Sequence, residues 1–292
     1  MKNILVTGSN GQLGSEIRKL EENFPGFQFV FTDIAELDLL DFTAVEEFVP
    51  KGEFNFCLNC AAYTAVDKAE DEEKLALKVN VDAVANLAQV CERNNVFLIH
   101  ISTDYVFNGE GFRPYIETDK TSPNSVYGWS KLKGEDAVFQ NTSHAIIIRT
   151  SWLCSAFGNN FVKTMLRLGK ERSELGVVFD QVGTPTFAAD LAKAMLIIAQ
   201  QTDLKSIQEI YHFSNEGAVS WYDFAKAIME EAGLDCKVNP IESKDFPTKA
   251  SRPFYSVLNK AKIKREFNID IPYWRDSLRK VIKEINSHAL PN

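Results

Sequence analysis

The feature that most constrains the fold of this chain is a glycine-rich turn between an apolar strand and a helix. The strand pattern covers residues 2–7, and Gly8, Gly11 and Gly14 follow it at once as Gly-x-x-Gly-x-x-Gly. In this setting glycines let a diphosphate approach the amides at a helix N-terminus, and they let helix and strand pack closely. The segment therefore predicts the first unit of a parallel α/β sheet that binds a dinucleotide.

A second apolar strand pattern, residues 27–32, ends at Asp33. An acidic residue at this distance from the glycine turn is placed to accept hydrogen bonds from the adenosine ribose hydroxyls. Because a carboxylate repels a 2′-phosphate, Asp33 argues against an enzyme that uses NADP exclusively.

Strand and helix patterns continue to alternate, which predicts a Rossmann-like doubly wound parallel sheet of the α/β class. We expect residues 1–150 to form a dinucleotide-binding Rossmann domain to which later segments, about 176–213, return. Residues 151–292 should form mainly a smaller α/β substrate-binding domain. The further elements expected are strands over 54–60, 96–101, 145–149, 177–180 and 210–213, and helices over 43–49 (capped by Asp41), from about 71 to 94, from Tyr127, over 159–170 and 186–200, from Ser220, and over 274–285.

Composition excludes several classes of protein. With 45% hydrophobic residues in 292, the chain can bury a large core, and its net charge of −8 argues against nucleic acid or an anionic membrane as a partner. The chain shows neither an apolar run that could span a bilayer nor a signal-peptide pattern, so a cytoplasmic location is expected.

Its five cysteines are expected to be reduced. Cys57 and Cys60 lie on a strand, where residues three apart face opposite sides, so no catalytic metal is expected.

Two groups of polar residues predict proton chemistry. Residues 102–104 follow the 96–101 strand, at the carboxyl end where open α/β sheets bind ligands. Tyr127 and Lys131 are four apart on one helix face. A positive charge about 4 Å from a phenol, at an effective dielectric of about 20, favours the phenolate by roughly 4 kcal/mol, or about three pKa units. Lys131 is therefore expected to bring the pKa of Tyr127 near neutrality. An exposed pair without a chemical role is the alternative, which the glycine turn disfavours.

Several longer motifs carry a family resemblance. They are Gly8/Gly11/Gly14 with Gln12, residues 59–70, residues 102–107, Tyr127-x-x-x-Lys131, residues 149–152 and residues 158–161. On these motifs the chain resembles the extended short-chain dehydrogenase/reductases and, more narrowly, the family of dTDP-4-dehydrorhamnose reductases. The resemblance covers the chain almost end to end, most strongly to about Asp190.

The resemblance implies an NAD(P)H-dependent oxidoreductase that reduces the C4 ketone of dTDP-4-dehydro-β-L-rhamnose, with NADPH or NADH as cofactor and a nucleotide sugar as substrate. It implies that Tyr127 donates the proton, that Thr103 polarises the carbonyl, and that Lys131 tunes the phenol and holds the nicotinamide ribose. The implied cofactor-binding residues are Gly8, Gly11, Gln12, Leu13, Gly14, Asp33, Asp41, Phe42, Ala61, Ala62, Tyr63, Thr64, Ser102, Tyr127 and Lys131. The implied substrate-binding residues are Val66, Asp67, Thr103, Asp104, Tyr105 and Trp152, although position alone predicts a core role for Trp152.

A monomer or a homodimer is expected. Some members of the family are dimers bridged by Mg²⁺ through acidic side chains. Glu16 matches one such position, but Ala189 stands beside Asp190 at another, so a complete Mg²⁺ site is not expected.

Two other functions remain open at this point. One is a nucleotide-sugar epimerase or dehydratase of the same superfamily, although Tyr105 follows Asp104 where a dehydratase has a glutamate. The other is a non-catalytic regulatory subunit of the methionine adenosyltransferase type, which an intact Tyr127 and Lys131 do not exclude.

Overall fold

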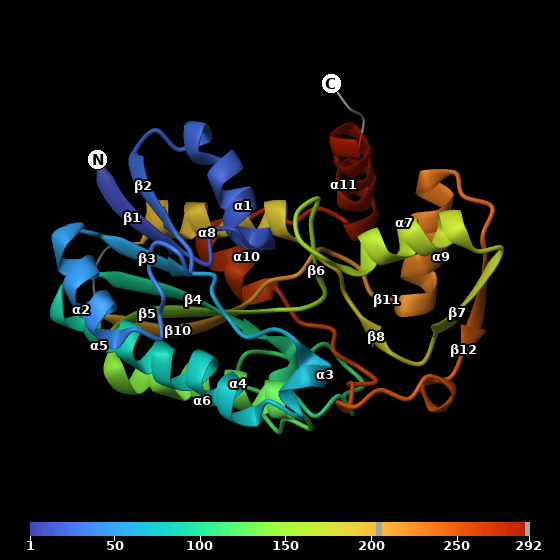
Figure 1. The fold of residues 1–292 in the computed structure, drawn as a ribbon, viewed down its shortest axis with the longest axis horizontal. Coiled ribbons are helices and arrows are strands. Elements are labelled where there is room, and N and C mark those ends of the chain that lie inside the picture. The colour runs from blue at the N-terminus through green and yellow to red at the C-terminus, as the bar shows by residue number, and fades with distance from the viewer. Residues whose placement is uncertain (203–205, 290–292) are drawn as a thin grey trace.

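A computed structural model describes residues 1–202 and 206–289, and its central feature is a parallel sheet of six strands (Figure 1). The chain moves from β1 outward to β2 and then resumes at β3 on the other side of β1. In open α/β sheets, ligands bind at the carboxyl ends of the strands where the order reverses in this way. The predicted Rossmann-like sheet is confirmed. From edge to edge its strands are β2 (Phe27–Thr32), β1 (Lys2–Thr7), β3 (Phe56–Asn59), β4 (Phe97–Thr103), β5 (His144–Thr150) and β10 (Ile207–His212).

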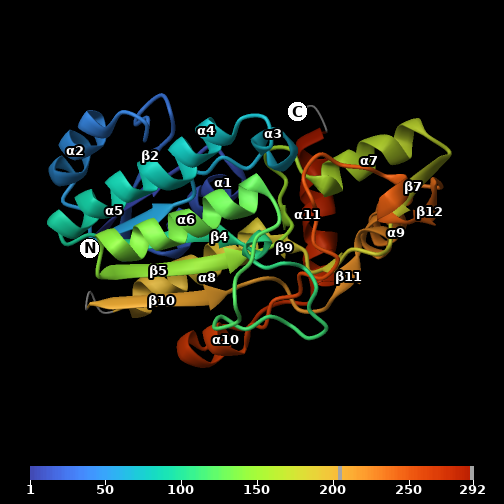
Figure 2. The ribbon, with the colours of Figure 1, turned by 90° about the horizontal axis from the view of Figure 1, so that it is seen from below.

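Helices cover both faces of the sheet (Figure 2). One face packs against α1 (Gln12–Lys19) and α8 (Ala188–Gln201), and the other against α2 (Phe42–Lys51), α5 (Ala83–Arg93) and α6 (Val126–Asn141). In the part of the chain that the structure describes, no helix is both long and apolar enough to cross a membrane.

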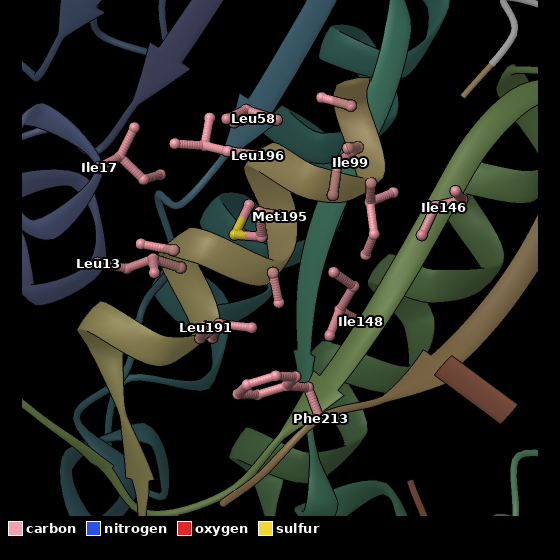
Figure 3. Close-up of a cluster of buried hydrophobic side chains, with 14 of the residues drawn as sticks. Leu13, Ile17, Leu58, Ile99, Ile146, Ile148, Leu191, Met195, Leu196 and Phe213 are labelled. Carbon is pink, nitrogen blue, oxygen red and sulfur yellow. The ribbon is translucent and has the colours of Figure 1, made fainter. Parts of the chain in front are cut away.

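The apolar layer beneath α8 holds the glycine turn in place (Figure 3). The strands are almost continuously apolar because parallel strands covered on both faces bury both sides. The side chains from α8, α1 and the strands that meet there include Leu191, Met195, Leu196, Leu13, Ile17, Leu58, Ile99, Ile146 and Ile148. This packing fixes α1, and so the turn before it, against the strand ends.

A smaller region lies beyond the carboxyl ends of the central strands (Figures 1 and 2). The segment 176–213 is divided between the two parts. Its first strand, β7 (Glu174–Val178), pairs with β12 (Lys237–Ile241) in the smaller region, whereas β10 pairs with β5 in the central sheet and α8 packs against that sheet. Residues 203–205 and 290–292 of the expected domains lie outside the described residues. The region contains the strand pairs β7 (Glu174–Val178) with β12 (Lys237–Ile241), β8 (Val182–Gly183) with β11 (Val219–Ser220) and β6 (Leu153–Cys154) with β9 (Thr186–Phe187), and the helices α7 (Phe161–Glu171), α9 (Trp221–Ala232) and α11 (Trp274–Ala289).

Side-chain caps explain where several helices begin. Asp41 accepts a hydrogen bond from the Ala44 amide at 3.0 Å and starts α2, as expected. Ser125 caps α6 in the same way, and Ser220 forms a reciprocal capping box at α9. The remaining short helices are α3 (Val66–Ala69), α4 (Glu73–Leu77) and α10 (Ala261–Phe267), with 3₁₀ turns at Glu21–Asn23, Asp104–Val106 and Ser243–Asp245.

The expectation of one long helix from about 71 to 94 is wrong in one respect. A π-helical turn, Lys78–Asp82, separates α4 from α5. It carries the buried Asn80, whose side chain bonds both backbone groups of Tyr63 and the hydroxyl of Ser130. These partners are distant in sequence, so local helix propensity could not reveal the interruption.

Candidate functional site

The glycine turn has the geometry of a diphosphate-binding turn. Gly8 has a φ of +63°, and a Cβ there would lie 2.7 Å from the amide nitrogen of Ala61. Gly11 is the N-cap of α1, so among the described residues the first amides of this helix have no side-chain cap. Free amides at a helix N-terminus attract anions. The residues present therefore fit the diphosphate of a dinucleotide. Gly14 lies in the buried first turn of α1.

The side chains of two further residues of this turn contact other parts of the protein. Gln12 donates to the Leu153 carbonyl at 3.3 Å and accepts from Asn160 at 2.9 Å, so it ties α1 to the smaller region. Leu13 is buried in the core beside α8. Contacts of these two residues with a cofactor would use mainly their backbone groups.

Asp33 and the start of α2 lie at the ends of neighbouring elements. The Asp33 carboxylate accepts from the amides of Asn10 and Ile34, both at 2.9 Å, and so links the end of β2 to the glycine turn. Asp41 caps α2, and Phe42 is 39% exposed at its first position. Their contact with a cofactor stays a prediction.

The segment after β3 is irregular backbone held by amide side chains. The Ala61 amide donates to Asn59 at 3.1 Å, and the Tyr63 amide donates to Asn80 at 2.9 Å. The Tyr63 phenol donates to Glu72 at 2.6 Å, and this bond raises the pKa of Tyr63 to about 12. Ala62 and Thr64 complete the segment, with Thr64 exposed.

Tyr127 is brought to the end of β4 by the close approach of α6. A Cβ on Gly128 would lie 2.4 Å from the Tyr105 carbonyl, so only glycine permits this packing. Tyr127 is 9% exposed, and its ring packs edge-on against Tyr105 with centroids 5.5 Å apart. Burial raises the pKa of Tyr127 above its ordinary value, while the neighbouring Thr103 hydroxyl acts in the opposite direction.

The expectation that Lys131 lowers the pKa of Tyr127 is wrong for this arrangement. The side-chain nitrogen of Lys131 lies instead against β4, 2.7 Å from the Ile101 carbonyl oxygen and 3.3 Å from Nε2 of His100. Burial lowers the pKa of Lys131 to about 8. A spacing of four residues places the two side chains on one helix face but does not decide which neighbours each one meets. The phenol therefore stays protonated at neutral pH.

Asp104 is a buried carboxyl group beside the phenol. Burial raises its pKa to about 6, against hydrogen bonds from Ser256 and Thr103. Thr103 donates to Oδ1 of Asp104 at 3.1 Å, and Oδ2 has no hydrogen-bond partner within residues 1–202 and 206–289. An unpaired carboxyl oxygen here is available to a polar ligand.

We expect Asp104→Asn to stabilise the free protein at higher pH. A carboxyl group with a raised folded-state pKa contributes stability below its unfolded pKa, about 3.9, that is lost as pH rises through about 6. The shift corresponds to about 3 kcal/mol at 1.36 kcal/mol per pKa unit. The unfolding free energy of the variant, relative to wild type, should therefore rise by about that amount between pH 4 and pH 8. Urea unfolding at several pH values measures it, with exposed Asp82→Asn as the control. A difference that does not vary with pH would contradict the buried charge.

The C-terminal segment supplies residues that sequence reasoning missed. Arg252 donates to Asp67 at 2.7 Å and interacts with the phenol of Tyr105, and the Ala250 amide also donates to Asp67. Val66 packs in the same cluster as Tyr105 and Tyr127. The sequence marked residues 248–253 only as basic and turn-rich, and nothing local connects them with Asp67.

Trp152 follows β5 in a left-handed conformation, with a φ of +46°. Its ring is half-buried and stacks on Trp221 with centroids 3.5 Å apart and planes 10° from parallel. Its carbonyl accepts a hydrogen bond from the Thr186 amide at 3.2 Å. A bulky residue in this conformation is strained and needs such support. The expectation of a plain core role is therefore incomplete, and the predicted substrate contact remains a prediction.

A buried ion pair lies behind the strand ends. Ser102 donates to Glu135, and Arg149 holds the same carboxylate through Nε at 2.9 Å and Nη2 at 2.7 Å. All three residues are buried. Ser102 is thus engaged with α6 through its side chain.

Glu16 and Asp190 do not share a metal-binding group. Glu16 is paired with Lys19, and Asp190 accepts from Asn215 and Ser277. Over residues 1–202 and 206–289, no cluster of three or more His, Cys, Asp or Glu side chains could hold a metal ion.

Comparisons with known proteins agree with this geometry. The family model described as "RmlD substrate binding domain" matches residues 1–287. A dTDP-4-dehydrorhamnose reductase of Aggregatibacter actinomycetemcomitans is 42% identical, covering 96% of this chain and 98% of that protein. The crystal structure of a dTDP-4-dehydrorhamnose reductase from Clostridium acetobutylicum has a TM-score of 0.93 at 41% identity, with 97% and 99% of the two chains covered. The enzyme of the same name from Bacillus anthracis, solved in complex with NADP, has a TM-score of 0.92 at 37% identity, with 97% and 100% covered. The resemblance predicted from the motifs is thereby confirmed, and the chain belongs to the RmlD substrate binding domain family.

Proposed function

We propose that this protein reduces the C4 ketone of dTDP-4-dehydro-β-L-rhamnose to dTDP-L-rhamnose, with NADPH or NADH as the reductant. The observation that carries the proposal is the meeting of the glycine turn and the Thr103–Tyr127 pair at one edge of the parallel sheet. Thr7, Asn59 and His100 are register partners across β1, β3 and β4, so the turn and Thr103 both extend beyond the same row. Relatives at 42% and 41% identity are named as this reductase.

The residues of the site have different roles in this reaction. The glycine turn and the first amides of α1 would bind the diphosphate of the dinucleotide, and Asp33 would accept hydrogen bonds from its adenosine ribose. When bound, the dinucleotide would supply the hydride that the ketone carbon accepts. Tyr127, protonated at neutral pH, donates its proton to the ketone oxygen, and the Thr103 hydroxyl turns from Asp104 to donate a second hydrogen bond to that oxygen. Lys131 would hold the nicotinamide ribose.

The sugar nucleotide would lie between the strand ends and the smaller region. Trp152 is connected to Asp104 through two contacts, because Gly183 lies against both Trp152 and Ser256, and Ser256 hydrogen-bonds to Asp104. Val66 and Asp67 are held beside Tyr105 and Arg252. We therefore assign Asp104, Tyr105, Val66, Asp67 and Trp152 to substrate binding.

One assay tests this function directly. NADPH and NADH oxidation should be followed against a panel of 4-keto-6-deoxy sugars linked to dTDP, UDP and GDP, with the products identified by mass spectrometry and NMR. We expect oxidation only with the dTDP-linked L-sugar and formation of dTDP-L-rhamnose. Absence of oxidation with every member of the panel would reject the proposal, and a 4-keto product made from dTDP-glucose would indicate a dehydratase instead.

A further inference from the structure

His100 is a buried residue that touches Lys131 and lies outside the motifs that predicted the site. The Lys131 nitrogen is 3.3 Å from Nε2 of His100 and donates to the Ile101 carbonyl at 2.7 Å. Lys131 is 2% exposed and His100 is 0% exposed. When two nitrogen groups lie this close in a buried site, one must donate the hydrogen bond and the other must accept it.

The other imidazole nitrogen fixes the tautomer of His100. Its Nδ1 lies 3.0 Å from Nδ2 of Asn59. The Ala61 amide donates to Oδ1 of Asn59 at 3.1 Å, and the Thr7 hydroxyl donates to the same oxygen at 2.8 Å, so the orientation of the Asn59 amide is set. Since Nδ2 of Asn59 can only donate, Nδ1 of His100 must accept, and the proton of the neutral imidazole sits on Nε2.

An Nε2–H group that faces Lys131 constrains the charge of the amine. An ammonium group has three donors and no acceptor, so it would meet this N–H donor to donor, whereas a neutral amine has a lone pair that accepts. For an ammonium group to be well paired, the proton of His100 would have to move to Nδ1 and the Asn59 amide would have to turn over. That turn would leave the Ala61 amide facing another donor.

The surroundings act in the same direction. Burial lowers the pKa of Lys131 to about 8, while the nearby Glu135 acts in the opposite direction, so the neutral amine predominates only at mildly alkaline pH. Burial, with the nearby Lys131, also lowers the pKa of His100 well below its ordinary value. His100 is therefore neutral. Among the charged groups on the elements packed around Lys131, Glu135 on α6 is the one that acts on its pKa, and its carboxylate is already paired with Arg149 on β5.

We propose that His100 is a positioning residue that favours the neutral amine of Lys131, so that this amine predominates in the free protein at mildly alkaline pH, and that Lys131 then takes up a proton from solvent when its nitrogen leaves His100 for a bound dinucleotide. The first half stands independently of the proposed function, and the second half rests on it. Ala61, which starts the hydrogen-bond chain to Lys131, lies against Gly8 of the glycine turn. The chain therefore joins the diphosphate end of the cofactor site to its nicotinamide end.

The first half is tested on the free full-length protein by NMR. With lysine labelled at Cε and Nζ, the Lys131 signal is the one missing from Lys131→Met. We expect it to titrate below about pH 8, and ¹⁵N-histidine spectra to show His100 with its proton on Nε2. A Lys131 signal that titrates near the ordinary value of about 10.4, or a His100 protonated on Nδ1, overturns the proposal.

Two variants test whether His100 itself sets the charge of Lys131 or whether the loss of any buried imidazole has the same effect. In His100→Gln the side-chain amide can turn its oxygen to an ammonium group, and in Asn59→Asp the carboxylate draws the imidazole proton to Nδ1. Both should raise the midpoint of the Lys131 titration by more than one pH unit. His212→Gln removes an equally buried imidazole from β10 and should leave that midpoint unchanged. Equal shifts in all three variants, or none in the first two, would refute the role of His100.

The second half is tested by calorimetry of NADPH binding at about pH 8.5, in buffers that differ in ionisation enthalpy. Wild type should take up close to one proton, and His100→Gln should take up far less. Binding of NADPH without proton uptake overturns this half. Absence of NADPH binding contradicts the proposed function, while the NMR result still decides the state of Lys131.

Discussion

Replacing Tyr127 with phenylalanine should lower turnover by about 10²- to 10⁴-fold, the range for loss of a positioned general acid, and leave NADPH affinity within a few-fold of wild type. The variant keeps the ring that packs against Tyr105 and removes only the hydroxyl that Thr103 contacts. The ketone oxygen would then receive its proton from water. Steady-state kinetics with the dTDP-linked sugar measure the loss, and fluorescence titration measures NADPH affinity.

Tyr211→Phe is the matched control for this experiment. Tyr211 is 1% exposed on β10, and its hydroxyl donates at 2.5 Å to Glu266 of α10, on the face of the sheet that α8 covers. Its loss should cost some stability and change turnover by no more than a few-fold. If Tyr127→Phe turned over substrate as fast as this control, Tyr127 could not be the proton donor.

Breaking the buried pair of Arg149 and Glu135 should have the largest effect on stability. We expect Arg149→Met to lower the free energy of unfolding by about 3–5 kcal/mol, because a carboxylate 3% exposed would lose its bidentate partner and keep only Ser102. Denaturant unfolding followed by tryptophan fluorescence and circular dichroism measures the change.

A double variant distinguishes the cost of leaving the Glu135 charge unpaired from the cost of losing the packing around Arg149. Arg149→Met together with Glu135→Met removes both charges, and it should lie within about 2 kcal/mol of wild type, since apolar replacement of a whole buried pair is often nearly neutral. The exposed pair of Arg167 and Glu171 provides the control, and Arg167→Met should cost less than about 1 kcal/mol. A double variant no more stable than Arg149→Met would show that the cost comes from packing around Arg149.

Much of the fold could be predicted because its signals are local. The strands over 2–7 and 27–32 have the predicted boundaries, since apolar runs between turn residues define buried parallel strands. Asp41 and Ser220 marked two helix starts through hydrogen bonds to amides a few residues away. The π-helical turn at Asn80 was not predictable, because its partners Tyr63 and Ser130 are brought to it only by the packing of other elements.

The candidate site also has features that the sequence predicts and features that it does not. Placing residues 102–104 and Tyr127 at the carboxyl edge of the sheet needed only strand positions and the parallel topology. The contribution of Arg252 and Ser256 depends on contacts across more than 150 positions of the chain, for which the sequence carries no periodic signal.

By itself, the sequence determined the parallel sheet, the glycine turn and the helix face that Tyr127 shares with Lys131, because strand period, helix period and turn residues act over a few positions. Only the tertiary structure decided that Lys131 meets His100 rather than the phenol, that Tyr127 stays protonated and that Asp104 is a weakened acid. These properties depend on desolvation and on donors and acceptors from distant strands, and both arise only when the chain has folded.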